Sequence, residues 1–85
     1  MGYRLVYTEG AAKDIRRLHP QVKQRLKLAL ERYSEAPLQF ALRLTNSEVG
    51  TYRFRVGDYR VVFDIQGDGL IILRVGHRRE IYRDK

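Results

Sequence analysis

Three arginines around a Gly-Asp pair are the residues of this sequence whose types and spacing are best suited to chemistry. Charged and apolar residues alternate on both sides of Gly57-Asp58, a dipeptide typical of the two-residue turn of a β-hairpin. With that turn, Arg55 lies opposite Arg60, and Arg53 lies on the same face two residues away. Guanidinium groups bind phosphate bidentately and stabilise charge that develops on it. The pattern therefore predicts a phosphate-binding face suited to phosphodiester chemistry.

The same register places the apolar residues of this hairpin on the opposite face, where they form a core surface for helices. These apolar residues are Tyr52, Phe54, Val56, Tyr59, Val61 and Phe63. Two arginines directly opposite one another destabilise a sheet by a few tenths to about 1 kcal/mol, and an anion bound between them offsets that loss. A solvent-exposed arginine face without a ligand is the alternative, because such faces are common.

Three residues near the end of the chain complete the candidate site. We expect His77, Arg78 and Tyr82 to lie at the rim of the arginine face. Histidine changes its charge near neutral pH, so His77 is the candidate for proton transfer. A tyrosine can stack on a base, an interaction worth roughly 1–3 kcal/mol. The alternatives are an incidental surface position for His77 and a core or edge position for Tyr82.

The elements that must position these residues follow from the hydrophobic pattern. It predicts a strand over 3–7, helices over 9–18 and about 20–34, a connecting segment over 36–48, and strands over 51–56, 59–65 and 70–75. Thr8 suits the N-cap of the first helix, and His19-Pro20 separates the two helices. This order predicts one α+β domain over residues 1–85. In that domain, an N-terminal strand and a helical hairpin precede an antiparallel three-stranded meander, and the helices pack on one face of a single sheet.

A further set of cations is predicted to bind RNA more weakly. Arg74 joins the arginine face if Leu73 and Val75 point into the core, a register that the loop length leaves open. The other members lie on the helices or after the last strand: Lys13, Arg16, Arg17, Lys23, Lys27 and Arg79. A solvated helix face is the alternative for the helical group, because such spacing is common on exposed helices.

The composition narrows the class of partner. Seventeen Lys and Arg against ten Asp and Glu give a net charge of +7, which favours a polyanion such as nucleic acid or an acidic protein. The basic residues comprise 13 arginines and 4 lysines, a bias towards phosphate binding. The sequence contains no cysteine and no cluster of Asp, Glu or His typical of a metal site, so we expect no metal and no cofactor. Neither a membrane span nor a signal peptide is evident, and we expect a cytoplasmic location.

Three strings in the second half of the chain resemble the RelE branch of the RelE/ParE toxin superfamily. They are YRFR at 52–55, GDYRVVF at 57–63 and VGHRREIYR at 75–83, and the resemblance extends over the whole chain. In that family, the toxin enters the ribosomal A site and cleaves messenger RNA, and a cognate antitoxin blocks it. The resemblance implies functional roles for Arg53, Arg55, Arg60, Arg78 and Tyr82. It also implies an acidic antitoxin and ribosomal RNA as partners.

The chain departs from the family pattern at two strand positions. Arg53 and Arg55 stand where relatives often have lysine, and arginine does not lose its proton near neutral pH. His77 occupies a position that is basic in relatives and supplies a group that titrates. We therefore expect cleavage without a metal, in which the 2′-hydroxyl of the RNA is the nucleophile, the arginines stabilise the charged phosphate and His77 transfers a proton.

Two other functions fit the same residues. ParE-type members of the superfamily inhibit DNA gyrase and need no nuclease residues. A non-catalytic module that binds RNA or the ribosome would also use the arginines, and an inactive toxin is a further alternative because arginine replaces lysine at two positions.

Overall fold

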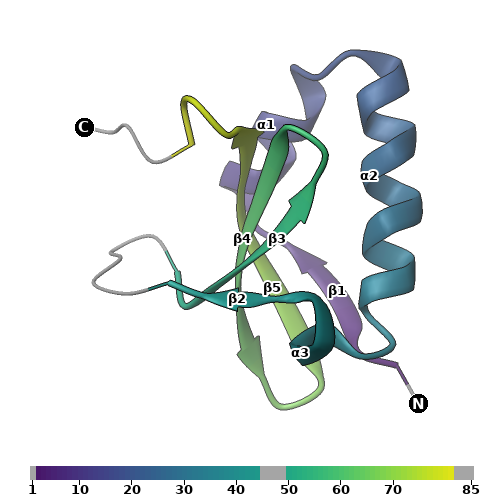
Figure 1. Ribbon diagram of the computed structural model, residues 1–85, viewed down its shortest axis with the longest axis vertical. Helices are drawn as coiled ribbons and strands as arrows, with labels where there is room; N and C mark the ends of the chain where they lie inside the picture. Colours follow the sequence, from purple (N-terminus) through teal and green to yellow (C-terminus); the bar gives the residue numbers. More distant parts are fainter. Residues whose placement is uncertain (1, 45–49, 82–85) are drawn as a thin grey trace.

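The computed structural model describes residues 2–44 and 50–81 of the chain. The elements, in chain order, are β1 (Arg4–Tyr7), α1 (Glu9–Arg16), α2 (Pro20–Tyr33), α3 (Pro37–Phe40), β2 (Leu42–Arg43), β3 (Tyr52–Val56), β4 (Tyr59–Gln66) and β5 (Gly69–His77). The strands form one five-stranded sheet in the order β1-β5-β4-β3-β2 (Figure 1). β1 is parallel to β5 and the other pairs are antiparallel. The predicted α+β fold with a three-stranded meander is confirmed.

Local signals explain where the helices begin and end. The Thr8 hydroxyl oxygen accepts a hydrogen bond from the Ala11 backbone N–H at 3.2 Å, as an N-cap should, and donates one to the Ile72 carbonyl at 2.8 Å. α1 ends at Arg16, two residues before the predicted end, and Pro20 occupies the first turn of α2. None of the described helices is long and apolar enough to cross a membrane.

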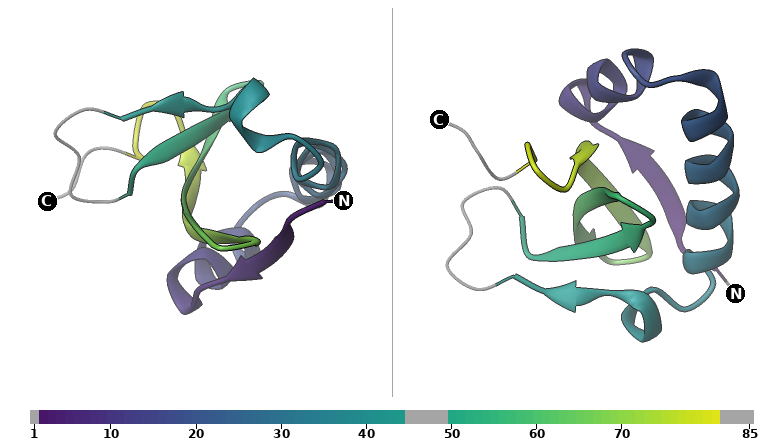
Figure 2. Two further views of the ribbon diagram at one scale, coloured as in Figure 1. Left: turned by 90° about the horizontal axis from the view of Figure 1, so that it is seen from below. Right: turned by 45° about the horizontal axis from the view of Figure 1, so that its top comes forward.

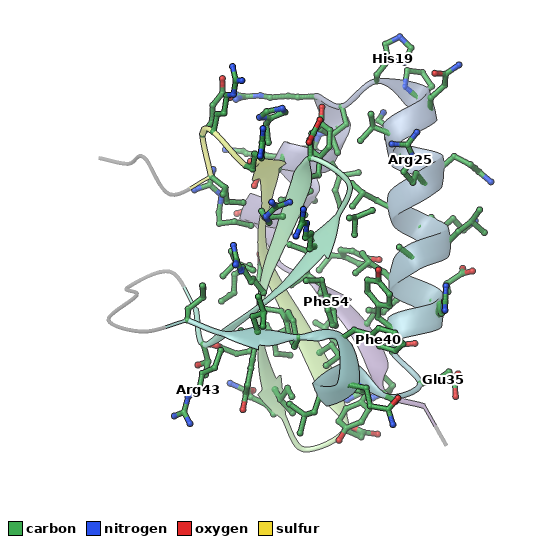
Figure 3. The ribbon with its side chains drawn as sticks, in the orientation of Figure 1. His19, Arg25, Glu35, Phe40, Arg43 and Phe54 are labelled. Carbon is green, nitrogen blue, oxygen red and sulfur yellow. The ribbon has the colours of Figure 1, made fainter. Side chains whose placement is uncertain are left out.

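The core lies between the sheet and α2. The rings of Phe54 and Phe63 stack with their centroids 4.2 Å apart, and Leu26 and Leu30 of α2 are almost completely buried in the same cluster. Figure 3 shows Phe54 on the side of the sheet that faces α2. β1 runs alongside α2 and leads into α1 (Figure 2). The predicted core face of the β3–β4 hairpin is therefore the face that the helices cover.

The segment predicted as a plain connection contains two short elements. α3 and β2 lie within 36–48, and β2 pairs with β3 through Leu42 opposite Arg53 and Arg43 opposite Tyr52. Neither element has enough residues to show a hydrophobic period, so tertiary contacts decide their structure. The Phe40 ring of α3 stacks on the Tyr33 ring of α2 with the ring centroids 4.6 Å apart, and this contact stabilises α3. Phe40 is labelled beside α2 in Figure 3.

The register of the last strand, which the sequence left open, contains an irregularity at Leu73. A β-bulge lies in the β4–β5 pairing, where Val62 is opposite Arg74 and Phe63 is opposite Ile72, so Leu73 is the extra residue. Ile72 is completely buried, whereas Leu73 is only partly buried. The alternation of side chains between the two faces therefore shifts by one residue at Leu73. Of the two residues on which the position of Arg74 was made to depend, Val75 is buried in the core and Leu73 is not.

Candidate functional site: an arginine cluster at the β3–β4 turn

The β3–β4 hairpin has the register that places two arginines side by side. Gly57 has a φ of 61°, the conformation that a tight hairpin turn requires and glycine adopts without strain. Arg55 lies opposite Arg60, as predicted. Cross-strand neighbours have their Cβ atoms about 4.5–5.5 Å apart. The turn therefore holds two guanidinium-bearing side chains on one face of the sheet.

Arg60 is held in place by the turn itself. Its Nη1 donates hydrogen bonds to the carbonyl oxygens of Gly57 and Tyr59, both at 2.9 Å, and only 7% of the residue is exposed. Arg55, in contrast, is exposed. A guanidinium fixed by carbonyls loses little further entropy when it binds an anion. Arg60 is thus a positive charge fixed by the backbone, and it lies opposite the exposed Arg55.

Arg78 is brought to the same turn by the residues that follow β5. Its backbone N–H donates to the Asp58 carbonyl at 2.7 Å, and its Nε lies 3.8 Å from the Asp58 carboxylate. The Arg78 side chain is about half exposed, at 51%. We define Arg55, Arg60 and Arg78 as the arginine cluster. Within residues 2–44 and 50–81, the Asp58 carboxylate lies beside Arg78, so the cluster combines three guanidinium groups with a nearby carboxylate.

Arg53 lies on the same face of β3 as Arg55, two residues further from the turn. It is opposite Val62, which is completely buried although it lies on the arginine face. The backbone at Gly50 covers this part of the face, because a Cβ at that position would lie 2.7 Å from Val62 Cγ1 and 2.8 Å from Leu73 Cδ1. An apolar patch thus occupies the middle of the predicted arginine face, and the cationic part is concentrated at the turn.

His77 lies on the opposite face of β5 from the position predicted for it. Its Cα partner is Tyr59, with the ring centroids 5.5 Å apart in an edge-on arrangement, whereas Arg60 is opposite Gly76. The placement of His77 on the arginine face is therefore wrong, because side chains alternate along β5. His77 Nδ1 accepts a hydrogen bond from the Arg79 backbone N–H at 3.2 Å. While this bond exists, the neutral ring carries its proton on Nε2. Tyr82, the last predicted member, lies outside the described residues.

Arg74 is engaged by a carboxylate that the sequence analysis did not single out. Its Nε lies 2.8 Å from Asp14 Oδ2, and the same oxygen accepts a hydrogen bond from the Val75 N–H at 2.9 Å. The hydrogen bond to Asp14 raises the pKa of Arg74 above its ordinary value. Arg74 does lie opposite Val62, as the arginine face requires, but its charge is directed to α1. An acidic residue among the basic residues of α1 was the available signal.

The remaining predicted cations lie on both helices and after β5. Lys13, Arg16, Arg17, Lys27 and Arg79 are exposed, and Lys23 is partly buried. Arg17 borders a pocket of about 340 Å³ beside His77 and Asp14. Arg25, which the sequence analysis did not select, has its Nη1 3.6 Å from the position of a Cβ on Gly57 and so adds positive charge near the turn. Its place on α2 is labelled in Figure 3.

Fold and site together define a class, which is a small α+β domain with buried and exposed guanidinium groups gathered at one hairpin turn. Across residues 2–44 and 50–81, no group of three or more His, Cys, Asp or Glu side chains is arranged to hold a metal ion. The arrangement can bind a phosphodiester and stabilise extra negative charge on it.

Comparison with known proteins identifies the family. A family model described as the ParE toxin of a type II toxin–antitoxin system matches residues 5–82. Toxin RelG of Mycobacterium tuberculosis is 33% identical over 86 residues, which cover 98% of this chain and 99% of RelG. Toxin RelE3 of Methanocaldococcus jannaschii is 29% identical over 83 residues, or 93% of this chain and 94% of that toxin.

A solved structure supports the same assignment. A chain of the RelBE2 toxin–antitoxin complex from Mycobacterium tuberculosis superposes with a TM-score of 0.81 at 30% identity, covering 92% of this chain and 100% of that chain. This chain therefore belongs to the RelE/ParE family of type II toxin–antitoxin toxins.

Proposed function

We propose that this toxin is a metal-independent endoribonuclease that cleaves messenger RNA in the ribosomal A site, in the cytoplasm, and so inhibits translation. The observation that carries the proposal is the convergence of Arg55, Arg60 and Arg78 on one turn, with Arg60 held by two carbonyls. RNA contains its own nucleophile, the 2′-hydroxyl, so the protein needs mainly to position the phosphate and stabilise the charge that develops on it.

In this proposal, each predicted catalytic residue has a defined role. Arg55, Arg60 and Arg78 bind the scissile phosphate and stabilise the phosphorane, and Arg53 binds a neighbouring phosphate. Tyr82 stacks on a base and keeps the nucleotide in line for attack. His77 donates a hydrogen bond from Nε2 and transfers a proton only after its bond to the Arg79 N–H is broken. Lys13, Arg17 and Arg79 contact ribosomal RNA, with Arg74 contributing only if Asp14 releases it.

The proposed protein partner is an acidic antitoxin. The RelBE2 structure from Mycobacterium tuberculosis is a toxin–antitoxin complex, and this chain carries a net charge of +7. An acidic, partly disordered chain that folds on the toxin surface fits that charge.

Gyrase inhibition is the second candidate function. It is favoured by the family model, which is described as a ParE toxin. Gyrase inhibition predicts DNA breaks that depend on gyrase, and the arginine cluster would then have no nuclease role.

The test is induction of the toxin in a bacterial host, with primer extension on a reporter messenger RNA. The informative variant is Arg55→Ala/Arg78→Ala, since both side chains are exposed and the fold should survive. The matched control is Arg4→Ala/Arg43→Ala, which removes the same charge at exposed positions on β1 and β2; Figure 3 shows Arg43 pointing outward from β2.

We expect growth arrest with cuts in the reading frame for the wild type and the control, and loss of both for the cluster variant. Arrest with gyrase-dependent DNA breaks and intact messenger RNA would replace the nuclease with the gyrase function. Cleavage of purified RNA at the same rate without ribosomes would remove the ribosome from the proposal.

A further inference from the structure

The last part of β5, which leads to Arg78, continues beyond the strand beside it. The parallel pairing of β1 with β5 ends at Tyr7 opposite Ile72. In the described part of the chain, no strand pairs with 73–77 on this side of β5. Such an edge presents backbone N–H and C=O groups that need other partners. α1, which follows β1 directly, lies against this end of β5 (Figure 1).

The N-cap and one side chain of α1 supply those partners. The Thr8 N–H and the Thr8 hydroxyl both donate to the Ile72 carbonyl, at 3.1 and 2.8 Å. Asp14 Oδ2 accepts a hydrogen bond from the Val75 N–H at 2.9 Å and lies 2.8 Å from Arg74 Nε. We call these contacts of Thr8 and Asp14 with β5 the α1 clamp. The clamp continues the pairing of β5 where β1 stops.

The close approach of α1 to β5 explains why a side chain as short as that of aspartate reaches the strand. A Cβ on Gly10 would lie 3.4 Å from the Leu73 carbonyl oxygen and 3.9 Å from Arg74 Cδ, so the helix backbone is almost in contact with β5. Residues four apart lie on one face of a helix, and Asp14 therefore points to β5 from the same face as Gly10.

The position of Arg78 depends on the part of β5 that the clamp holds. Ile81 is buried and packs on β5, since a Cβ on Gly76 would lie 3.4 Å from Ile81 Cδ1. The Arg78 N–H donates to the Asp58 carbonyl at 2.7 Å. Arg78 follows Val75 by three residues and lies between these two anchors. A shift of Val75 and Gly76 therefore moves Arg78 relative to the β3–β4 turn.

The two contacts of Asp14 constrain β5 to different degrees. The bond to Arg74 engages the end of a long side chain that is 44% exposed, so it restrains the strand backbone weakly. The bond to the Val75 N–H acts on the backbone itself, at a half-buried place where an unsatisfied donor is costly. The second contact is the one that can fix the end of β5.

We propose that Asp14 is a positioning residue for Arg78. By accepting the Val75 N–H, its side chain fixes the end of β5 and so holds the Arg78 guanidinium beside Arg55 and Arg60. Asp14 touches no substrate in this scheme and acts only through Arg78. The effect on cleavage rests on the proposed nuclease function, whereas the effect on the place of Arg78 does not.

The experiment separates the hydrogen bond of Asp14 from its charge and from stability. Asp14→Ala removes the acceptor and the charge, and Asp14→Asn removes the same charge but keeps an acceptor oxygen. Leu26→Ala, in the core on α2, is the control for a loss of stability away from β5. If Asp14→Ala does not fold, Asp14→Ser gives the same test, because its shorter side chain does not reach both donors.

Two readouts are needed. Single-turnover cleavage is measured for each variant, alone and combined with Arg78→Ala, per molecule shown to be folded by thermal unfolding. Amide hydrogen exchange of Arg78, followed by NMR, reports on its bond to the Asp58 carbonyl without any need for RNA.

We expect Asp14→Ala to lower cleavage by about 10–10²-fold, and Asp14→Asn and Leu26→Ala to stay close to the wild type. With Arg78→Ala, Asp14→Ala should cause little further loss, because the group that it displaces is absent. The Arg78 amide should exchange faster in Asp14→Ala than in Leu26→Ala.

Three results would overturn the inference. An undiminished loss in the Arg78→Ala background would mean that Asp14 acts through another group. Equal losses in Asp14→Ala and Asp14→Asn would assign the effect to charge, and an equal loss in Leu26→Ala would assign it to stability. A wild type that does not cleave RNA contradicts the proposed function alone, since exchange of the Arg78 amide still decides whether Asp14 positions it.

Discussion

The arginine cluster and the α1 clamp each hold an arginine in place, but they differ in the group that holds it. In the cluster, Arg60 donates to the backbone carbonyls of Gly57 and Tyr59, which carry no net charge. In the clamp, Arg74 binds the carboxylate of Asp14. A guanidinium held by carbonyls keeps its charge for a phosphate, whereas a carboxylate neutralises it. The net charge of +7 alone therefore does not show which arginines bind RNA.

The largest effect that distinguishes the two regions is expected for Arg60. Arg60→Ala should lower RNA cleavage by about 10²–10³-fold if its guanidinium acts as a preorganised donor to the phosphate. Arg60→Lys should recover only part of that loss, since an ammonium cannot donate to both carbonyls in the same geometry and also reach a phosphate. Single-turnover cleavage on programmed ribosomes measures the rate.

Thermal stability is the control for this substitution. Arg60 is buried, so thermal unfolding must first show that both variants are folded. Folded Arg60→Ala toxin that still cleaves at the wild-type rate would contradict the role of Arg60 in the cluster.

The sequence predicted the cluster better than the clamp for a physical reason. A two-residue turn sets the register of a hairpin, so the position of Gly57-Asp58 was enough to place Arg55 opposite Arg60. The clamp depends on how α1 packs against the edge of β5, and no local pattern determines that packing. Thr8 was predicted as a helix N-cap, but its contact with β5, and that of Asp14, could not be predicted.

The residues around β5 show a second limit. The β-bulge at Leu73 changes the phase of alternation along β5, which no local pattern indicates. His77 was expected at the rim because the strand was expected to end at residue 75, but β5 continues to His77, and alternation from Val75 puts it on the core face. The pairing of Arg74 with Asp14 joins residues 60 positions apart, which no spacing rule connects. The short elements α3 and β2 were missed because tertiary contacts stabilise them.

The next largest effect is a loss of stability when Asp14, the ion-pair partner of Arg74, is removed. The Asp14 side chain is 14% exposed and accepts hydrogen bonds from Arg74 and from the Val75 N–H. Asp14→Ala should lower the free energy of unfolding by about 1.5–3 kcal/mol, the range for hydrogen bonds to a charged group. Urea denaturation measures this change. Asp68→Ala is the control, since its ion pair with Arg4 is 70% exposed on both sides and should contribute about 0–1 kcal/mol.

Cleavage by the same variants tests the boundary of the cluster. Arg74→Ala should cleave at nearly the wild-type rate per folded molecule, because the charge of Arg74 is directed to Asp14. A loss as large as that of Arg55→Ala would add Arg74 to the cluster.

Salt should separate the two regions by a smaller factor. Three phosphate contacts to single-stranded RNA give a slope of about −2 in log affinity against log salt, so a rise from about 50 to 200 mM should weaken RNA binding roughly 20-fold. Arg74→Ala should keep this slope, whereas Arg55→Ala/Arg78→Ala, which leaves one contact, should reduce it to about −0.7. Fluorescence anisotropy with a 2′-O-methyl RNA, which cannot be cleaved, measures the slopes. Equal slopes for the two variants would mean that Arg74 contacts phosphate as the cluster arginines do.

The smallest effect is expected at Asp58, and it has the opposite sign. Its carboxylate lies 3.8 Å from the Arg78 Nε and lowers the positive charge of the cluster. Asp58→Asn keeps a residue that suits a turn and removes the negative charge, so RNA affinity should rise by up to about fivefold, the value of one exposed ion pair. The matched control is Asp68→Asn, at the other hairpin turn, which releases Arg4 instead. Anisotropy with the 2′-O-methyl RNA should show a gain for Asp58→Asn and none for Asp68→Asn. An equal gain for both would mean that net charge, and not the position of Arg78 at the β3–β4 turn, controls RNA binding.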